Sequence, residues 1–253
     1  MICKGKMNSL LSKVCMAFLI SVMGCSITNA EFLSQNEKKA SKEIVVLIHG
    51  LGRSNMAMWR LASRIEEAGY HVVRVGYSSL NQTPQAILQD VTQQINDCCA
   101  VSKQPVHFVG HSLGGLMIRA YLQDNRPKNF GRVVLMGTPN QGTEVVDYYR
   151  DHWWMKLAGP MANALGTDEK SFPNTLKDPD YPVGVIAGIT ESPVPEEVLP
   201  GHDDGLVSVE STKVSGMSDF ILVETGHSMM RYNEEVANQA IYFLKHGHFS
   251  DKK

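Results

Sequence analysis

Short, unbroken runs of apolar residues recur along this chain, and polar residues are concentrated between them. The first run is Ile44–Ile48, and five similar runs occupy residues 71–75, 106–109, 133–136, 183–187 and 220–223. A strand with one face in water alternates apolar and polar residues, whereas a strand buried on both faces of a parallel sheet reads as a continuous apolar run. The pattern therefore predicts six strands in a mostly parallel sheet.

Helical periodicity fills most of the gaps between these runs. Apolar residues recur at helical spacing over residues 56–68, 84–98, 113–123 and 234–244. Gly69 is placed to cap the end of the first helix, and Thr83 with Pro84 is a favourable start for the second. The alternation of strands and helices predicts an α/β fold in which helices cover both faces of the sheet.

Residues 143–180 interrupt this alternation, because they contain no clear strand. We interpret them as a short lid-like insertion on the carboxyl side of the sheet, where open α/β sheets bind ligands. Its prominent apolar residues are Trp153, Trp154, Met155, Leu157, Met161 and Leu165. The first three are candidate substrate-binding residues. The alternative is that the whole set packs the insertion against the sheet.

The first thirty residues are typical of a targeting segment. Lys4, Lys6 and Lys13 precede an apolar stretch over residues 14–23, which is shorter than the roughly 20 residues that span a bilayer. A basic flank before a short apolar stretch predicts a secretory signal peptide over residues 1–30, cut after Ala30. A second interpretation is a lipoprotein leader, since residues 22–25 resemble a lipobox that ends in Cys25. A third is an uncleaved N-terminal anchor.

Composition favours one globular domain over residues 43–247, after a polar linker at residues 31–42 and before a short tail at 248–253. The chain has 253 residues, of which 43% are hydrophobic, enough for a substantial core. Its 24 Lys and Arg residues against 26 Asp and Glu residues give a net charge of −2, without a basic cluster beyond the leader. This argues against a nucleic-acid partner. We expect an exported protein, periplasmic or secreted, or held at a membrane surface by a lipid on Cys25.

Two adjacent cysteines, Cys98 and Cys99, are the only ones that follow residue 30. A bridge between neighbouring residues strains the peptide that joins them. We therefore expect no structural disulfide and no metal site.

A glycine-flanked serine stands at the junction of a predicted strand and a predicted helix, in the segment Gly110-His111-Ser112-Leu113-Gly114-Gly115. A serine hydroxyl is a weak nucleophile unless it is exposed on a sharp turn beside a base. The motif alone is weak, because it arises by chance in many chains. The preceding strand and the following helix are the context that it requires, and they make Ser112 the candidate nucleophile.

A second glycine-rich segment, His49-Gly50-Leu51-Gly52, follows the first predicted strand. Attack by Ser112 on a carbonyl would create an oxyanion, which two backbone N–H groups usually stabilise. Leu113, next to the nucleophile, and Leu51, in this loop, are the candidate donors. We expect His49 to brace the loop.

The candidate base and acid follow the last two predicted strands. His227 lies in a turn just after the final strand, where it would point back over Ser112, while the side chain of the neighbouring His111 should point away from the nucleophile. The acid that orients His227 is expected in the segment Asp203-Asp204-Gly205, and Asp204 is our first assignment, with Asp203 as the alternative. The order serine, acid, histidine is that of α/β-hydrolases.

The chain resembles the lipases and esterases of the α/β-hydrolase superfamily, particularly the small bacterial members. The resemblance covers about residues 44 to 245 and rests on four segments in the family's order: 48–52, 109–115, Gly137-Thr138-Pro139-Asn140-Gln141-Gly142-Thr143, and 203–207. It implies the α/β-hydrolase fold, a triad of Ser112, Asp204 and His227, an oxyanion hole at Leu51 and Leu113, and no metal or other cofactor. Asp203 departs from the family, whose members often have Asn there.

The resemblance implies a serine carboxylic-ester hydrolase, an esterase or a lipase, that forms an acyl-enzyme on acyl esters or lipids. A phospholipase, a thioesterase or an acyltransferase would use the same residues. A binding module without catalysis is the remaining class, although such proteins usually lack a triad member. Acyl-chain length and oligomeric state are not determined by the sequence.

Overall fold

The computed structural model describes residues 42–251, so the predicted leader and nearly all of the linker lie outside the described residues. The described part contains one sheet of six strands: β1 (Ile44–Ile48), β2 (His71–Val75), β3 (Val106–His111), β4 (Phe130–Met136), β5 (Val183–Ile189) and β6 (Asp219–Glu224). Their order is β2-β1-β3-β4-β5-β6, and every neighbouring pair is parallel. The predicted α/β fold with six strands is therefore confirmed.

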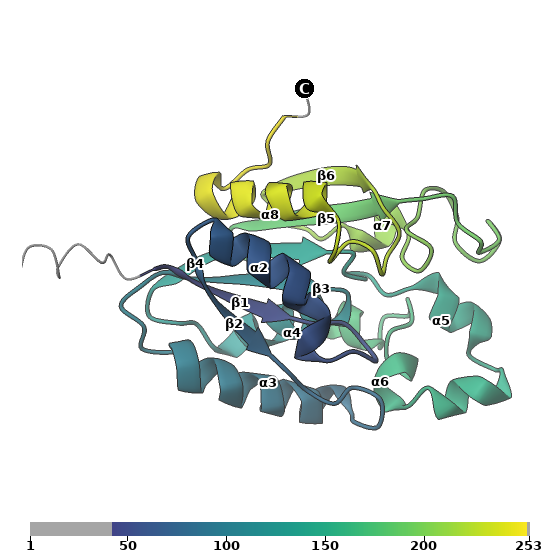
Figure 1. Ribbon diagram of the computed structural model, residues 1–253. Helices are drawn as coiled ribbons and strands as arrows, with labels where there is room; N and C mark the ends of the chain where they lie inside the picture. Colours follow the sequence, from purple (N-terminus) through teal and green to yellow (C-terminus); the bar gives the residue numbers. More distant parts are fainter. Residues whose placement is uncertain (1–41, 252–253) are drawn as a thin grey trace, which may run out of the picture. The chain divides into compact units, whose positions relative to one another are not determined.

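Two layers of helices enclose this sheet (Figure 1). The long helices are α2 (Trp59–Glu67), α3 (Pro84–Cys99), α4 (Leu113–Asp124) and α8 (Glu234–His246). Side chains of α3 and α4 share one buried cluster with Val46 and Ile48, while α2 and α8 share the other with Val45 and Leu47. Successive residues of β1 thus enter opposite cores, which is why its sequence is apolar without alternation.

Helix boundaries follow the capping residues. The Thr83 hydroxyl accepts a hydrogen bond from the Ala86 N–H at the start of α3, and Pro84 is the first residue of that helix. Asn233 caps α8 in the same way, and Gly247 ends it in the left-handed conformation. These local signals explain why α3 begins where the sequence predicts.

The connection between β4 and β5 contains only short helical segments: α5 (Glu144–Tyr149), η2 (Trp153–Leu157), α6 (Pro160–Asn163) and η3 (Phe172–Thr175). Met155, Met161 and Leu165 are buried in the cluster that α3 and α4 share. Trp153 and Leu157 are exposed, at 74% and 75%. The segment therefore anchors itself to the domain through part of its apolar residues and presents the rest to solvent.

One expectation from the sequence is wrong: Cys98 and Cys99 form a disulfide. The bridge lies at the last two residues of α3. Cys99 is buried and Cys98 is exposed. Peptide strain argues against such a bridge inside a regular element, and the end of a helix relaxes that constraint.

Helix α4 approaches the sheet at a glycine. A Cβ atom at Gly114 would lie 2.2 Å from the carbonyl oxygen of Ile48 in β1. Only glycine permits this contact, because backbone atoms cannot move aside as a side chain can. The close approach brings the start of α4 against the end of β1.

We expect Gly114→Ala to lower the free energy of unfolding by about 1–3 kcal/mol through overpacking against β1. Chemical denaturation measures the effect. Gly226→Ala is the matched control, since the nearest atoms to its added Cβ would lie at 3.6 and 3.9 Å. Equal stability of the two variants would contradict the role assigned to Gly114.

Candidate active site

Ser112 occupies the turn between β3 and α4 in a strained backbone conformation. Its φ is 56° and its ψ is −126°, and no other residue besides glycine has a positive φ between residues 42 and 251. Its N–H donates a hydrogen bond to the carbonyl of Met136 at the end of β4, at 2.9 Å. Strain of this kind persists only where surrounding contacts enforce it, and it is concentrated at functional sites.

Three side chains predicted from the sequence come together at the carboxyl edge of the sheet. The Ser112 Oγ lies 2.9 Å from Nε2 of His227, and Nδ1 of His227 lies 2.7 Å from Oδ2 of Asp204. All three are buried, with exposed fractions of 8%, 9% and 2%. A serine, an imidazole and a carboxylate in this order can transfer a proton from the hydroxyl to the ring and stabilise the resulting positive charge.

The geometry distinguishes the two neighbouring aspartates. Asp204 Oδ1 accepts hydrogen bonds from the N–H groups of Leu206 and Val207, at 3.0 and 2.9 Å, which leaves Oδ2 directed at His227. Asp203 Oδ1 accepts from the N–H of Gly205 at 2.6 Å instead. Asp203 therefore shapes the turn, and Asp204 is the carboxylate that contacts the histidine.

The proposed oxyanion donors lie on the two sides of the nucleophile. Leu113 is the first residue of α4, so its N–H has no acceptor within the helix. On the other side, a Cβ at Gly50 would lie 3.0 Å from the Ser112 Cβ, so the loop that contains Leu51 runs beside the serine. The next N–H, that of Gly52, donates to the buried Ser79 hydroxyl at 2.8 Å, which anchors this loop.

His49 braces the same loop, as the sequence suggests. Its Nε2 accepts a hydrogen bond from the Tyr77 N–H at 3.3 Å, its Nδ1 donates to the Gly50 carbonyl at 2.9 Å, and its ring stacks on Tyr77 at 4.2 Å between centroids. Burial lowers the pKa of His49 below its usual value. The ring is thus neutral and structural.

His111 lies much closer to His227 than the sequence suggests. Its ring contacts that of His227, with centroids 4.9 Å apart, and its Nε2 donates to the His227 carbonyl at 2.8 Å. No sequence signal marks this contact, because the two residues are 116 positions apart and meet only when β3 and the loop after β6 share one edge.

The segment 137–144 is hydrogen-bonded to the loop that carries Asp204, a contact that the sequence does not reveal. Thr143 Oγ1 donates to the Leu206 carbonyl at 2.6 Å, and Glu144 Oε1 accepts from the hydroxyls of Ser208 and Ser211 at 2.9 and 3.1 Å. These bonds join the segment after β4 to the residues that immediately follow Asp204. Gly137, at the start of the segment, lies beside the carboxylate itself, since a Cβ there would be 3.1 Å from Asp204 Oδ2.

Arg119, on α4, holds the segment 137–144 through hydrogen bonds to Asn140. It is 3% exposed on α4, and its Nη1 donates to the Asn140 carbonyl and side-chain oxygens at 3.0 and 3.2 Å. Asn140 Nδ2 in turn donates to the Thr212 carbonyl at 2.7 Å, beyond the acid loop in the short helix α7 (Val209–Thr212). Burial lowers the pKa of Arg119. Helix α4, which begins directly after Ser112, is thus connected to the segment that follows Asp204.

The candidate substrate-binding residues of the insertion do not share one environment. Trp153 is exposed, and Met155 is 5% exposed within the core. The side chain of Trp154 lies outside the described part of the structure. Trp153 alone of the three is thus seen to present apolar surface to solvent.

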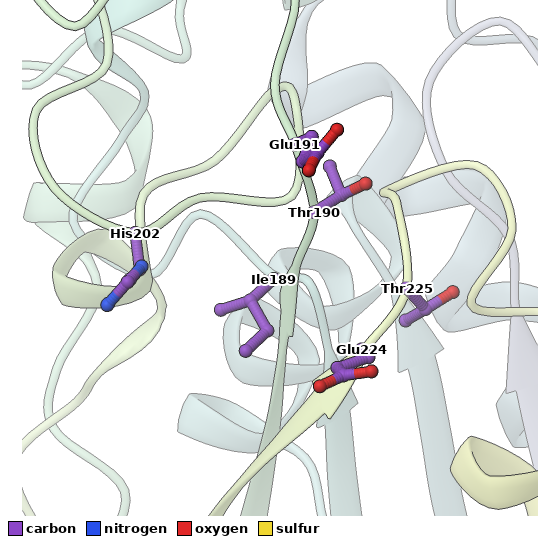
Figure 2. Close-up of a pocket in the computed structure, with 6 residues that line it drawn as sticks. All are labelled: Ile189, Thr190, Glu191, His202, Glu224 and Thr225. Carbon is purple, nitrogen blue, oxygen red and sulfur yellow. The ribbon is translucent and has the colours of Figure 1, made fainter.

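A pocket of about 490 Å³ opens at the carboxyl ends of β5 and β6 (Figure 2). Its lining is Ile189, Thr190, Glu191, His202, Glu224 and Thr225. No triad residue lines it. Thr225 lies two residues before His227, and its N–H donates to the Ile189 carbonyl. The wall of the pocket is thus continuous with the loop that carries His227.

Residues 42–251 contain no cluster of three His, Cys, Asp or Glu side chains suited to a metal ion, and no helix among them has the length and apolar character of a membrane span.

Comparisons with known proteins agree with this architecture. Similar solved structures include the mature lipase of Bacillus licheniformis, with a TM-score of 0.53 and 18% identity over 75% of this chain and 86% of that one. An extracellular α/β-hydrolase from a Paenibacillus species has a TM-score of 0.52 and 17% identity, over 79% of this chain and 98% of that one. A lipase-esterase related protein from Clostridium acetobutylicum has a TM-score of 0.50 and 17% identity, over 82% of this chain and 95% of that one. At these identities the likeness concerns the fold.

The family match comes from the sequence itself. A model of the palmitoyl protein thioesterase family matches residues 44–182, more than half of the chain, from β1 to the residue before β5. This range contains the Gly50–Leu51 loop, Ser112 and the segment 137–144. The chain belongs to the palmitoyl protein thioesterase family, within the α/β-hydrolase superfamily.

Proposed function

We propose that this protein is a serine hydrolase that cleaves carboxylic acyl esters through Ser112, His227 and Asp204. The supporting observation is the continuous chain of short contacts from the Ser112 Oγ through His227 to Asp204 Oδ2. A hydroxyl on a strained turn, a buried base in contact with it and a carboxylate with its second oxygen fully engaged are the parts that acyl transfer requires.

The proposed reaction has two halves. His227 Nε2 accepts the Ser112 proton while Oγ attacks the carbonyl carbon, and the N–H groups of Leu51 and Leu113 stabilise the oxyanion. Collapse of the tetrahedral intermediate breaks the ester C–O bond, and His227 returns the proton to the departing alcohol. Water, deprotonated by His227, then attacks the acyl-enzyme and releases the carboxylic acid together with free Ser112.

An acyl thioester is the second candidate substrate, and the family match favours it. The chemistry differs only in the leaving group, a thiol in place of an alcohol, so the same residues would act. An acyltransferase reaction would follow if an alcohol replaced water at the second half.

The exposed side of the insertion is the proposed contact for the acyl chain. Trp153 and Leu157 present apolar surface there, on a segment next to the loop after β2: a Cβ at Gly159 would overlap the Leu80 carbonyl, and Gly52 faces the Leu80 side chain. Leu80 is itself 53% exposed. Exposed apolar groups from two loops on the catalytic side fit a long acyl chain better than a short one.

We further propose that the protein is exported, with cleavage after Ala30 or lipidation at Cys25. The intact mass of the exported protein distinguishes these, because a lipidated chain would begin at residue 25 and carry acyl groups. A mass that retains the first residues would contradict both.

Ser112→Ala should abolish hydrolysis while the fold is retained, because the nucleophile is lost. The measurement is turnover of p-nitrophenyl esters from acetate to palmitate and of an acyl thioester, with wild type and variant side by side and circular dichroism as the control. Faster turnover of the thioester would favour the second candidate. Turnover by the variant near that of wild type would exclude Ser112 as the nucleophile, and no turnover by folded wild type would favour a binding module.

Asp204→Asn should lower kcat by several orders of magnitude, by analogy with about 10⁴ in the serine-protease triad. Asp203→Asn is the matched control, because its oxygen accepts only from the turn at Gly205. We expect its kcat to stay near that of wild type. A greater loss in Asp203→Asn than in Asp204→Asn would reverse the assignment of the acid.

Trp153→Ala should raise KM for palmitoyl esters more than for acetyl esters, because it removes apolar surface that only a long chain reaches. Tyr148→Ala is a suitable control, since Tyr148 is also exposed, at 55%, but lies on α5. An equal effect of Trp153→Ala on both chain lengths would show that the tryptophan does not contact the acyl chain.

A further inference from the structure

His111 is a buried polar residue whose role the reaction above leaves unexplained. It is the last residue of β3, directly before Ser112, and it is 2% exposed. Its Nε2 donates to the His227 carbonyl at 2.8 Å, and the planes of the two rings meet at 45°. A residue that only filled space here would be apolar, because an unpaired buried polar atom is costly. His111 Nδ1 has no hydrogen-bond partner in the described part of the protein.

The protonation state of His111 follows from its surroundings. A carbonyl can only accept, so Nε2 carries the proton and Nδ1 is the bare nitrogen. Burial holds the pKa of His111 well below 6.5, the nearby His227 and the positive charges of Arg231 and Arg53 act in the same direction, and the bond to the His227 carbonyl opposes them. His111 is therefore a neutral donor with a fixed tautomer.

The contact completes the restraint of His227. The His227 N–H donates to the Asp204 carbonyl at 2.7 Å, Nδ1 contacts Asp204 Oδ2, Nε2 contacts Ser112, and the carbonyl accepts from His111. Every polar group of His227 is thus engaged, and three residues supply the partners. Asp204 holds the amino side of its backbone, and His111 holds the carbonyl side.

We propose that His111 is a positioning residue that keeps the His227 ring on the line between Ser112 and Asp204 by fixing the His227 carbonyl. This inference rests on the proposed serine-hydrolase function. Loss of the bond would free the carbonyl side of the loop, so that the ring drifts from the nucleophile. A displacement of about 1 Å at a catalytic group can cost on the order of 100-fold in rate.

Two amide variants test the bond itself. The amide nitrogen of Gln occupies nearly the position of histidine Nε2, whereas the shorter Asn side chain places its amide near Nδ1 and cannot reach the carbonyl. We expect His111→Asn to lower kcat by about 10- to 100-fold with little change in KM, and His111→Gln to recover most of that loss. Both variants carry the same polar group, so a difference between them reports its reach.

The division of the effect between kcat and KM supplies a readout that a general packing defect would not give. Misalignment of the His227 ring slows the chemical step, so kcat should be lower in His111→Asn than in His111→Gln while KM is the same in both. His107 is the control for a buried histidine on the same strand. It is 3% exposed, and its ring bonds to Glu43 and to the Arg132 N–H at the other end of β3. His107→Gln should leave kcat and KM near those of wild type.

The outcomes are separated by labelling Ser112 with a fluorophosphonate, whose rate depends on an aligned His227. If folded wild-type protein does not react, the proposed function fails, and this inference fails with it. If wild type reacts and His111→Asn reacts as fast as His111→Gln, the inference alone is overturned. Should His111→Asn not fold, a wild-type labelling rate in His111→Leu, which has no donor, would likewise overturn it, and a slow rate in folded His111→Leu would support it.

Discussion

The backbone turn at Ser112 is the constraint on which the rest of the site depends. A serine at a φ of 56° holds a conformation that costs about 1–3 kcal/mol, and the neighbouring contacts enforce it. The Ser112 N–H is held by the Met136 carbonyl of β4, and the start of α4 is pressed against β1 at Gly114. The two strands that flank β3 and the helix that follows it thus fix Ser112 independently of the loops that carry His227 and Asp204.

His227 and Asp204 reach Ser112 from loops rather than from regular elements, so the precision of their placement must come from hydrogen bonds. His227 has all its polar groups engaged, by Asp204, Ser112 and His111. The acid loop is held by Thr143 and Glu144. Loops supported in this way combine access for a substrate with the fixed geometry that proton transfer needs.

The segment Gly137–Thr143 acquires a physical explanation from these contacts. In the sequence it serves only as a motif that supports a resemblance. In the folded protein it lies between α4 and the acid loop, where Asn140 links Arg119 to Thr212 and Thr143 contacts the residue two positions after Asp204. The motif therefore connects α4 to the loop that carries Asp204.

The sequence by itself determined the strands, the main helices and two of the three residues that meet at the site, Ser112 and His227. It could do so because unbroken apolar runs, capping residues and a serine between glycines are local patterns with a direct physical cause, and because parallel strands place the loops that follow them at one edge. Tertiary structure alone decided the rest: which aspartate contacts His227, the contact of His111 with the His227 carbonyl, the burial of Met155 beside an exposed Trp153, and the bridge between Cys98 and Cys99. Each of these depends on the direction in which a side chain or a backbone group points, and that direction is set by partners distant in the sequence or by the end of a helix, which no local pattern records.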